Sequence, residues 1–170
     1  MIDENGKERQ YHLISLGLSE RATQQVQSLR TNLWRSTGEL SFQALRPLIP
    51  LCWSRHPIGT LATIQLEAPP SPLNFQRIAS RQHSLFLITD NPEWTAWYDK
   101  VAPRILQGVR TEGPTQVGVG IYLGRGLLGI DCAPIENDDW RLLLYRVTWR
   151  VSEEQTIHVR HTLLEDRHLV

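Results

Sequence analysis

Apolar positions along the first third of the chain predict strands on either side of one helix. Residues 11–18 alternate between apolar and polar positions, which is typical of a strand. Ser19 is a good helix N-cap, and apolar residues at helical spacing continue from there to about Arg35. Further strands are expected at 45–53 and at 60–66. This part of the chain is therefore predicted to run strand, helix, strand, strand.

The second half of the chain repeats the order strand, helix, strand. Residues 84–89 form an apolar strand, and Trp94 and Trp97 mark the inner face of the helix that follows. A tryptophan pair at this spacing is more typical of a core than of a ligand site. The glycine-rich stretch at 118–125 is the next predicted strand, and residues 131–139 are expected to form a loop.

Two prolines predict irregularities in these elements. Pro50 lies inside the strand at 45–53 and has no backbone N–H, so this strand is expected at a sheet edge or a bulge. Pro103 lies inside the second helix, whose start is marked by Asn91-Pro92-Glu93. Because proline removes a helical hydrogen bond, it is expected to kink this helix or to split it in two.

Two strands, at 140–151 and 155–164, are expected to close the chain as a hairpin. Because side chains alternate along a strand, His158 and His161 fall on opposite faces and cannot jointly hold a metal ion. The polar face is expected to be solvated, and the alternative is a basic stripe that binds phosphate. The polar face consists of Arg146, Thr148, Arg150, His158, Arg160 and Thr162, and the apolar face of Val147, Trp149, Val151, Ile157, Val159 and Leu163.

The fold class that follows is α+β. The pattern from Tyr11 to Trp53 recurs from Ser84 to Arg125, which predicts two pseudo-duplicated strand–helix–strand lobes with antiparallel sheets around a central cleft. The length suits a single domain. The expected parts are a polar tail at 1–10, lobes at about 11–67 and 84–125, a closing hairpin at 140–164, and one domain over 11–165.

Composition and charge exclude several function classes. The net charge is zero, which removes a global electrostatic argument for nucleic-acid binding. However, residues 1–85 carry nine basic and six acidic groups, and residues 86–170 carry nine basic and twelve acidic groups. No apolar run is long enough for a membrane span, and residues 1–10 lack the apolar core of a signal peptide.

The two cysteines, Cys52 and Cys132, have no metal-like spacing. They are expected to be buried thiols of a cytoplasmic protein. No metal site and no cofactor are predicted from them.

Five of the eleven glycines lie between Gly118 and Gly129, which predicts a close backbone approach or a cleft there. A dinucleotide fingerprint needs a strand before its glycines and a helix that opens within them. Here the glycines lie inside the strand, so this cofactor is not expected. A Walker loop is absent as well, because the chain has no Gly-Lys-Ser/Thr.

The tandem layout resembles the 2H phosphoesterases, the superfamily of 2′-5′ RNA ligase-like proteins and cyclic nucleotide phosphodiesterases. In that family each lobe contributes a His-x-Thr/Ser strand. The corresponding strands here are Pro47-Leu48-Ile49-Pro50-Leu51 and Val119-Gly120-Ile121-Tyr122-Leu123-Gly124-Arg125. The resemblance covers roughly residues 10–165 and implies a two-lobed fold with a cleft between the motif strands.

The resemblance also implies how catalysis would work and where this chain departs from it. One motif histidine of the family acts as general base and the other as general acid. Leu48 and Gly120 occupy these two positions here, while Pro50 and Tyr122 occupy the hydroxyl positions. Leucine and glycine cannot transfer a proton. The comparison therefore favours a degenerate member with no assigned catalytic residue, although enzyme activity stays an open question.

Three hypotheses follow. The first is a binding or interaction module for a nucleotide, an RNA end or a protein. The second is a phosphoesterase of cyclic phosphodiesters or RNA ends with rearranged residues centred on His56, Tyr122 and Arg125. The third is an interaction protein that uses its tryptophans at a dimer or partner interface. The candidate ligand-binding residues are Arg46, Leu48, Pro50, Gly120, Tyr122 and Arg125.

Overall fold

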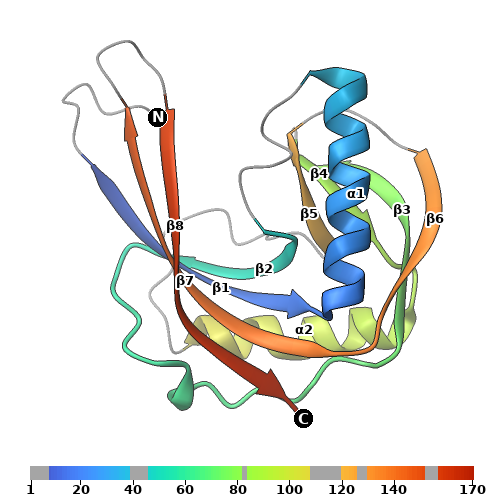
Figure 1. The fold of residues 1–170 in the computed structure, drawn as a ribbon. Coiled ribbons are helices and arrows are strands. Elements are labelled where there is room, and N and C mark those ends of the chain that lie inside the picture. Colours follow the sequence, from blue (N-terminus) through green and yellow to red (C-terminus); the bar gives the residue numbers. More distant parts are fainter. Residues whose placement is uncertain (1–7, 39–45, 82–83, 108–119, 126–129, 152–156) are drawn as a thin grey trace.

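The protein has an α+β fold, as the pattern predicts. The computed structural model describes residues 8–38, 46–81, 84–107, 120–125, 130–151 and 157–170, in which two antiparallel four-stranded sheets and two α-helices are found (Figure 1). In chain order the elements are β1 (Arg9–Leu18), α1 (Glu20–Thr37), β2 (Leu48–Ser54), the 3₁₀ helix η2 (Leu61–Thr63), β3 (Leu73–Arg81), β4 (Ser84–Ile88), α2 (Pro92–Gln107), β5 (Gly120–Arg125), β6 (Ile130–Asn137), β7 (Trp140–Val151) and β8 (Ile157–Leu169).

The two sheets have corresponding strand orders. The first runs β2-β1-β7-β8 and the second β5-β4-β3-β6. In each sheet, two strands joined through a helix pair antiparallel: β1 with β2 through α1, and β4 with β5 through α2. The edge strands β2 and β5 come into contact where the sheets meet. Each helix lies against the sheet of the other lobe, α1 against β5 and β6 and α2 against β2 (Figure 1).

The main core lies where both sheets and both helices meet. Trp94 of α2 stacks on Trp97 and on Trp140 of β7, and the ring of Phe75 packs edge-on against Trp94 and Trp140. Trp94 and Trp97 are buried, which confirms that this pair belongs to the core. A smaller apolar cluster, made of Leu13, Leu48, Leu143, Tyr145 and Val147 with Trp53 against it, lies on the first sheet.

Both predicted helix starts are confirmed. The Ser19 hydroxyl accepts a hydrogen bond from the Ala22 amide at 3.3 Å, and Asn91 Oδ1 accepts from the Glu93 amide at 2.8 Å. Helix α1 ends at Gly38, whose φ of 74° is a left-handed conformation that suits glycine.

The second helix is not split at Pro103. It runs as one helix from Pro92 to Gln107. Val101 and Ile105, on either side of the proline, are both buried in the main core. Packing on both sides holds the two halves of the helix in one element, and this outweighs the loss of one backbone hydrogen bond.

The strand predicted at 60–66 is wrong. This segment contains the short helix η2, because side chains rather than a neighbouring strand bind its backbone. Glu165 accepts from the Leu61 amide at 2.8 Å, and Arg167 donates to the carbonyls of Leu61 and Ile64 at 2.8 and 2.7 Å. These hydrogen bonds satisfy backbone groups that a strand would pair in a ladder.

The loop predicted at 131–139 is also wrong over most of its length. Residues 130–137 form β6, an edge strand that pairs with β3. The sequence pattern does not predict β3 either. An edge strand is half solvated, so β6 needs few apolar residues and its alternation is weak.

The strand boundaries agree with the sequence pattern in part. Strand β1 already begins at Arg9, inside the expected tail, and β8 continues to Leu169, beyond the expected hairpin end. Strand β7 has the predicted limits. Strand β2 is an edge strand, and its register with β1 shifts between Cys52 and Pro50, which confirms the irregularity expected at this proline.

The two cysteines differ in how deeply they are buried. Cys52 is buried, as expected, whereas Cys132 is only partly buried. Burial raises the pKa of the Cys52 thiol to about 11, so this group stays protonated and unreactive at neutral pH.

No helix in the described ranges combines the length and apolar character that a membrane crossing requires.

Candidate functional site

The two strands that resemble family motifs, β2 and β5, lie against each other at the junction of the sheets. Leu48 and Pro50 are buried, and Leu48, with 0% of its surface exposed, packs against Leu13 and Leu143 in the smaller apolar cluster. Because both side chains are enclosed by the protein, neither is open to a ligand in this conformation. Their role in ligand binding stays a prediction.

Gly120 stands where the resemblance places the second histidine. It is buried, and a Cβ atom added to it would lie 2.5 Å from the Leu87 carbonyl oxygen and 2.9 Å from a methyl carbon of Ile88. Real Cβ atoms do not approach a carbonyl oxygen this closely. The backbone of β5 therefore approaches β4 at a distance that only glycine permits, and a histidine fits there only if the strands move apart.

Tyr122 lies two residues farther along β5 and is half-buried. Its ring packs edge-on against Phe86, with 5.7 Å between the ring centres. Its backbone carbonyl accepts a hydrogen bond from the guanidinium of Arg30, which reaches it from α1. The side chain of Arg125, the other polar candidate on β5, lies outside the described part of the structure.

The remaining candidates lie at the ends of β2. Arg46 is exposed and lies beside the Tyr145 hydroxyl; burial raises the pKa of Tyr145, and Arg46 acts in the opposite direction. His56 is exposed in the turn after β2, where its amide donates to the Ser54 hydroxyl at 3.0 Å. Among the described residues, no hydrogen bond joins His56 to Tyr122, and their catalytic role stays a prediction.

A different site is formed on one face of the first sheet, where β1, β7 and β8 lie side by side. Its backbone register aligns three cross-strand rows. His12, Arg146 and Thr162 make one row, Gln10, Thr148 and Arg160 the next, and Arg150 and His158 a third. This confirms that the polar residues of the closing hairpin share one face.

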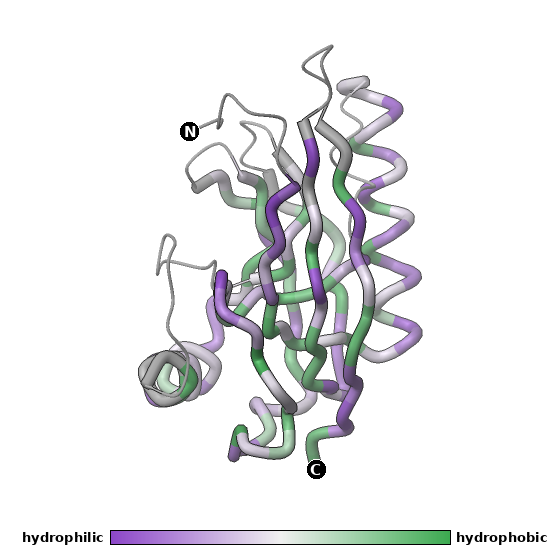
Figure 2. The backbone as a smooth tube through the Cα atoms, turned by 90° about the vertical axis from the view of Figure 1, so that its left-hand side faces the viewer, coloured by the Kyte–Doolittle hydropathy of each residue, from purple (hydrophilic) through white to green (hydrophobic). Residues whose placement is uncertain are grey.

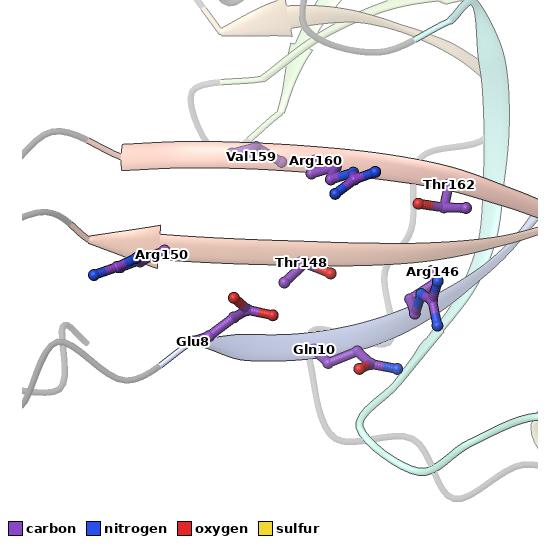
Figure 3. Close-up of a pocket in the computed structure, with 8 residues that line it drawn as sticks. All are labelled: Glu8, Gln10, Arg146, Thr148, Arg150, Val159, Arg160 and Thr162. Carbon is purple, nitrogen blue, oxygen red and sulfur yellow. The ribbon is translucent and has the colours of Figure 1, made fainter.

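These rows line a hollow of about 700 Å³, which we call the arginine groove (Figure 3). Its walls come from the start of β1, the second half of β7 and the first half of β8. Hydrophilic and hydrophobic positions alternate along neighbouring strands of the backbone (Figure 2). The lining residues are Glu8, Gln10, Arg146, Thr148, Arg150, Val159, Arg160 and Thr162.

The arginine groove carries three positively charged side chains. Arg146, Arg150 and Arg160 are exposed, and within the described ranges none of them forms an ion pair with a carboxylate. Glu8 is the acidic side chain in the lining, and it lies at the Arg150 end of the groove (Figure 3). Three guanidinium groups against one carboxylate favour an anionic ligand.

His12 lies beside the inner end of this groove. It is on the same face as Arg146, its cross-strand neighbour, and on the other side its neighbour is Ser54 of β2. Only 5% of the residue is exposed. Burial lowers the pKa of His12, and the charge of Arg146 lowers it further, so the imidazole is neutral at neutral pH.

We expect the protein to lose stability as the pH falls from about 7 to about 5, with His12 as one cause. Burial lowers the pKa of His12 and of His161 below the ordinary value of 6.5. The unfolded chain therefore takes up protons first as the pH falls through this range, which favours unfolding. Urea denaturation should show a smaller pH-dependent loss for His12→Gln than for wild type, and equal losses would refute the assignment.

No metal site competes with this interpretation in the described ranges, where no group of three His, Cys, Asp or Glu side chains could hold an ion. Comparisons with protein-family models, with curated proteins and with solved structures find no match.

The sequence pattern identifies part of the arginine groove and misses the rest. Period-two alternation places Arg146, Thr148, Arg160 and Thr162 on one face without knowledge of the fold. It gives no information about which strand lies beside β7, so the contribution of Gln10 stays hidden. Pairing between β1 and β7 joins residues far apart in the chain.

Proposed function

We propose that this chain is a non-catalytic, 2H phosphoesterase-like module that binds the phosphates of a nucleotide or an RNA in the arginine groove. The observation that carries the proposal is the set Arg146, Arg150 and Arg160, three exposed guanidinium groups that have no carboxylate partner among the described residues and share one hollow. The hydroxyls of Thr148 and Thr162 lie between and beside them and can donate to phosphate oxygens.

The chemistry of these side chains suits a phosphate ligand. A guanidinium group presents a planar fork of donors that matches two phosphate oxygens at once. Arg146 and Arg150 are four positions apart on β7, which separates them by about 13 Å at ~3.3 Å per strand residue. This spacing allows the two guanidinium groups to contact different phosphates of one ligand, such as a short RNA.

The two-lobed arrangement supports the family resemblance in this proposal. The strand orders of the two sheets correspond, and the motif-like strands β2 and β5 meet at the junction. Leu48 and Gly120 supply no proton-transfer group at the positions where the family has histidines. The proposed role is therefore recognition without the family's reaction.

The alternative hypotheses make different predictions. A phosphoesterase centred on His56, Tyr122 and Arg125 would hydrolyse 2′,3′-cyclic nucleotides. An interaction protein would use exposed tryptophans. Trp94, Trp97 and Trp140 are buried, whereas Trp34 and Trp53 are partly exposed. The arginine groove favours phosphate binding over both.

The direct test is binding of a short fluorescein-labelled single-stranded RNA, followed by fluorescence anisotropy. We expect Arg146→Ala and Arg160→Ala each to raise the Kd about tenfold, since a hydrogen bond to a charged group contributes about 1.5 kcal/mol. Each substitution should also reduce the slope of log affinity against log salt by about 0.7 for every phosphate that the variant no longer neutralises.

The matched control is Arg77→Ala. Arg77 is also an exposed arginine on a strand, but it lies on the second sheet and pairs with Asp90 at 2.9 Å. RNA binding by this variant should equal that of wild type. If Arg77→Ala weakens binding as much as Arg146→Ala, the effect is one of general charge and the groove is not the site. Turnover of a 2′,3′-cyclic nucleotide that is abolished in His56→Ala would support the phosphoesterase instead.

A further inference from the structure

Exposure along β1 falls toward the inner end of the arginine groove. On β1, Gln10 is exposed, whereas His12, two residues farther on the same face, is buried with 5% of its surface exposed. Beyond His12 the same face continues into Ile14, which belongs to the main core. Along β1, the polar surface that a phosphate chain could contact therefore ends at His12.

Within the described structure, one ring nitrogen of His12 has no hydrogen-bond partner, and this indicates which tautomer the ring adopts. Its Nδ1 is buried and has no hydrogen-bond partner, whereas Nε2 is not among the buried, unpartnered atoms of the described structure. A buried N–H without an acceptor is rarer in proteins than a buried lone pair without a donor. The neutral ring is therefore expected to carry its proton on Nε2, which makes this nitrogen a donor.

The neighbours of His12 add two side chains that can bind a phosphate group. Arg146 lies directly across on β7, and Thr162 lies next to Arg146 on β8 in the same cross-strand row. Arg146 and Thr162 also line the groove (Figure 3). One row thus offers an imidazole, a guanidinium and a hydroxyl. A phosphate seated against it would also offset the positive charge of Arg146.

We propose that the row His12, Arg146 and Thr162 recognises a terminal phosphate monoester, with His12 as the residue that distinguishes it from a hydroxyl end. The inference rests on the proposed function of the groove and specifies which part of the ligand binds where. A terminal monoester carries a charge of about −1.5 to −2 and three acceptor oxygens. An internal phosphodiester carries one charge, and a hydroxyl end carries none.

The test compares short single-stranded RNAs of one sequence, labelled internally, that carry a 5′-phosphate, a 3′-phosphate or hydroxyls at both ends. Wild type should bind one of the phosphorylated RNAs about tenfold more tightly than the hydroxyl-ended RNA. His12→Leu fills the buried position with an apolar side chain, so it should fold. This variant should lose the preference while its affinity for the hydroxyl-ended RNA stays unchanged. His12→Gln, which retains an amide donor, should keep part of the preference.

The outcomes separate this inference from the proposed function. If wild type binds all three RNAs equally, or if His12→Leu keeps the preference, the inference is wrong although the groove still binds RNA. If wild type binds none of them, both the inference and the proposed function are wrong. Inorganic phosphate as competitor should abolish the preference at concentrations that leave binding of the hydroxyl-ended RNA intact, and equal competition against all three RNAs would refute the terminal site.

Discussion

Replacing Gly120 with alanine is expected to lower the free energy of unfolding by about 2–3 kcal/mol, a cost typical of overpacking. The added Cβ would lie 2.5 Å from the Leu87 carbonyl oxygen, which belongs to the backbone of β4 and cannot rotate away. Strands β4 and β5 would have to separate, and this weakens the ladder that joins them. Urea denaturation followed by tryptophan fluorescence measures the effect.

The control is Gly59→Ala. Gly59 is exposed, and a Cβ added to it meets no atom within 4 Å. Its stability should stay within about 0.5 kcal/mol of wild type. If both substitutions cost the same, close approach of the strands is not what requires glycine at position 120.

The same close approach bears on the family resemblance. A Gly120→His change would introduce the residue type that the resemblance implies at this position, but the new side chain would start from the same clash with Leu87. Reconstructing the motif would therefore require movement of β5 relative to β4. The absence of proton-transfer chemistry at Gly120 is built into the strand spacing as well as into the residue type.

Replacing Arg30 with alanine is expected to lower the free energy of unfolding by about 3 kcal/mol, since truncating a large buried side chain leaves a cavity and an unpaired acceptor. Arg30 lies on α1 with 1% of its surface exposed, and its guanidinium donates to the Tyr122 carbonyl on β5. Burial lowers the pKa of Arg30 to about 10, so the group is still charged at neutral pH. Thermal and urea unfolding both measure the effect.

Two further variants separate the causes. Arg35→Ala, an exposed arginine in the last turn of the same helix, should change stability by less than about 0.5 kcal/mol. Arg30→Met keeps most of the apolar volume and removes the buried charge, so it should recover part of the stability. An Arg30→Ala variant as stable as Arg35→Ala would show that the hydrogen bond to β5 contributes nothing to the fold.

The sequence predicted those elements of the fold that depend on hydrogen bonds between residues close together in the chain. Ser19 and Asn91 mark helix starts because their side chains cap free amides within three residues of themselves. The strand predicted at 60–66 failed for the opposite reason, since Glu165 and Arg167 come from more than a hundred residues away. Sequence pattern cannot show that such distant side chains will replace a strand partner.

The sequence likewise predicted one part of the candidate site and missed another. Alternation along β7 and β8 predicted a basic face with Arg146 and Arg160, because strand geometry alone determines it. His12 was not predicted as part of a site, since its position next to Arg146 depends on how β1 pairs. Leu48 and Gly120 illustrate a second limit. The resemblance suggests that they match the histidine positions of the family, whereas their burial depends on the packing around them and could not be predicted from the sequence.

The exchange of helices between the lobes has a consequence for how the molecule holds together. Helix α1 follows β1 in the chain but lies against β5 and β6, while α2 follows β4 but lies against β2. If the two lobes were separated, each sheet would lose the helix that covers it. Each lobe therefore depends on a helix that the other lobe contributes, and we expect the two lobes to fold and unfold together.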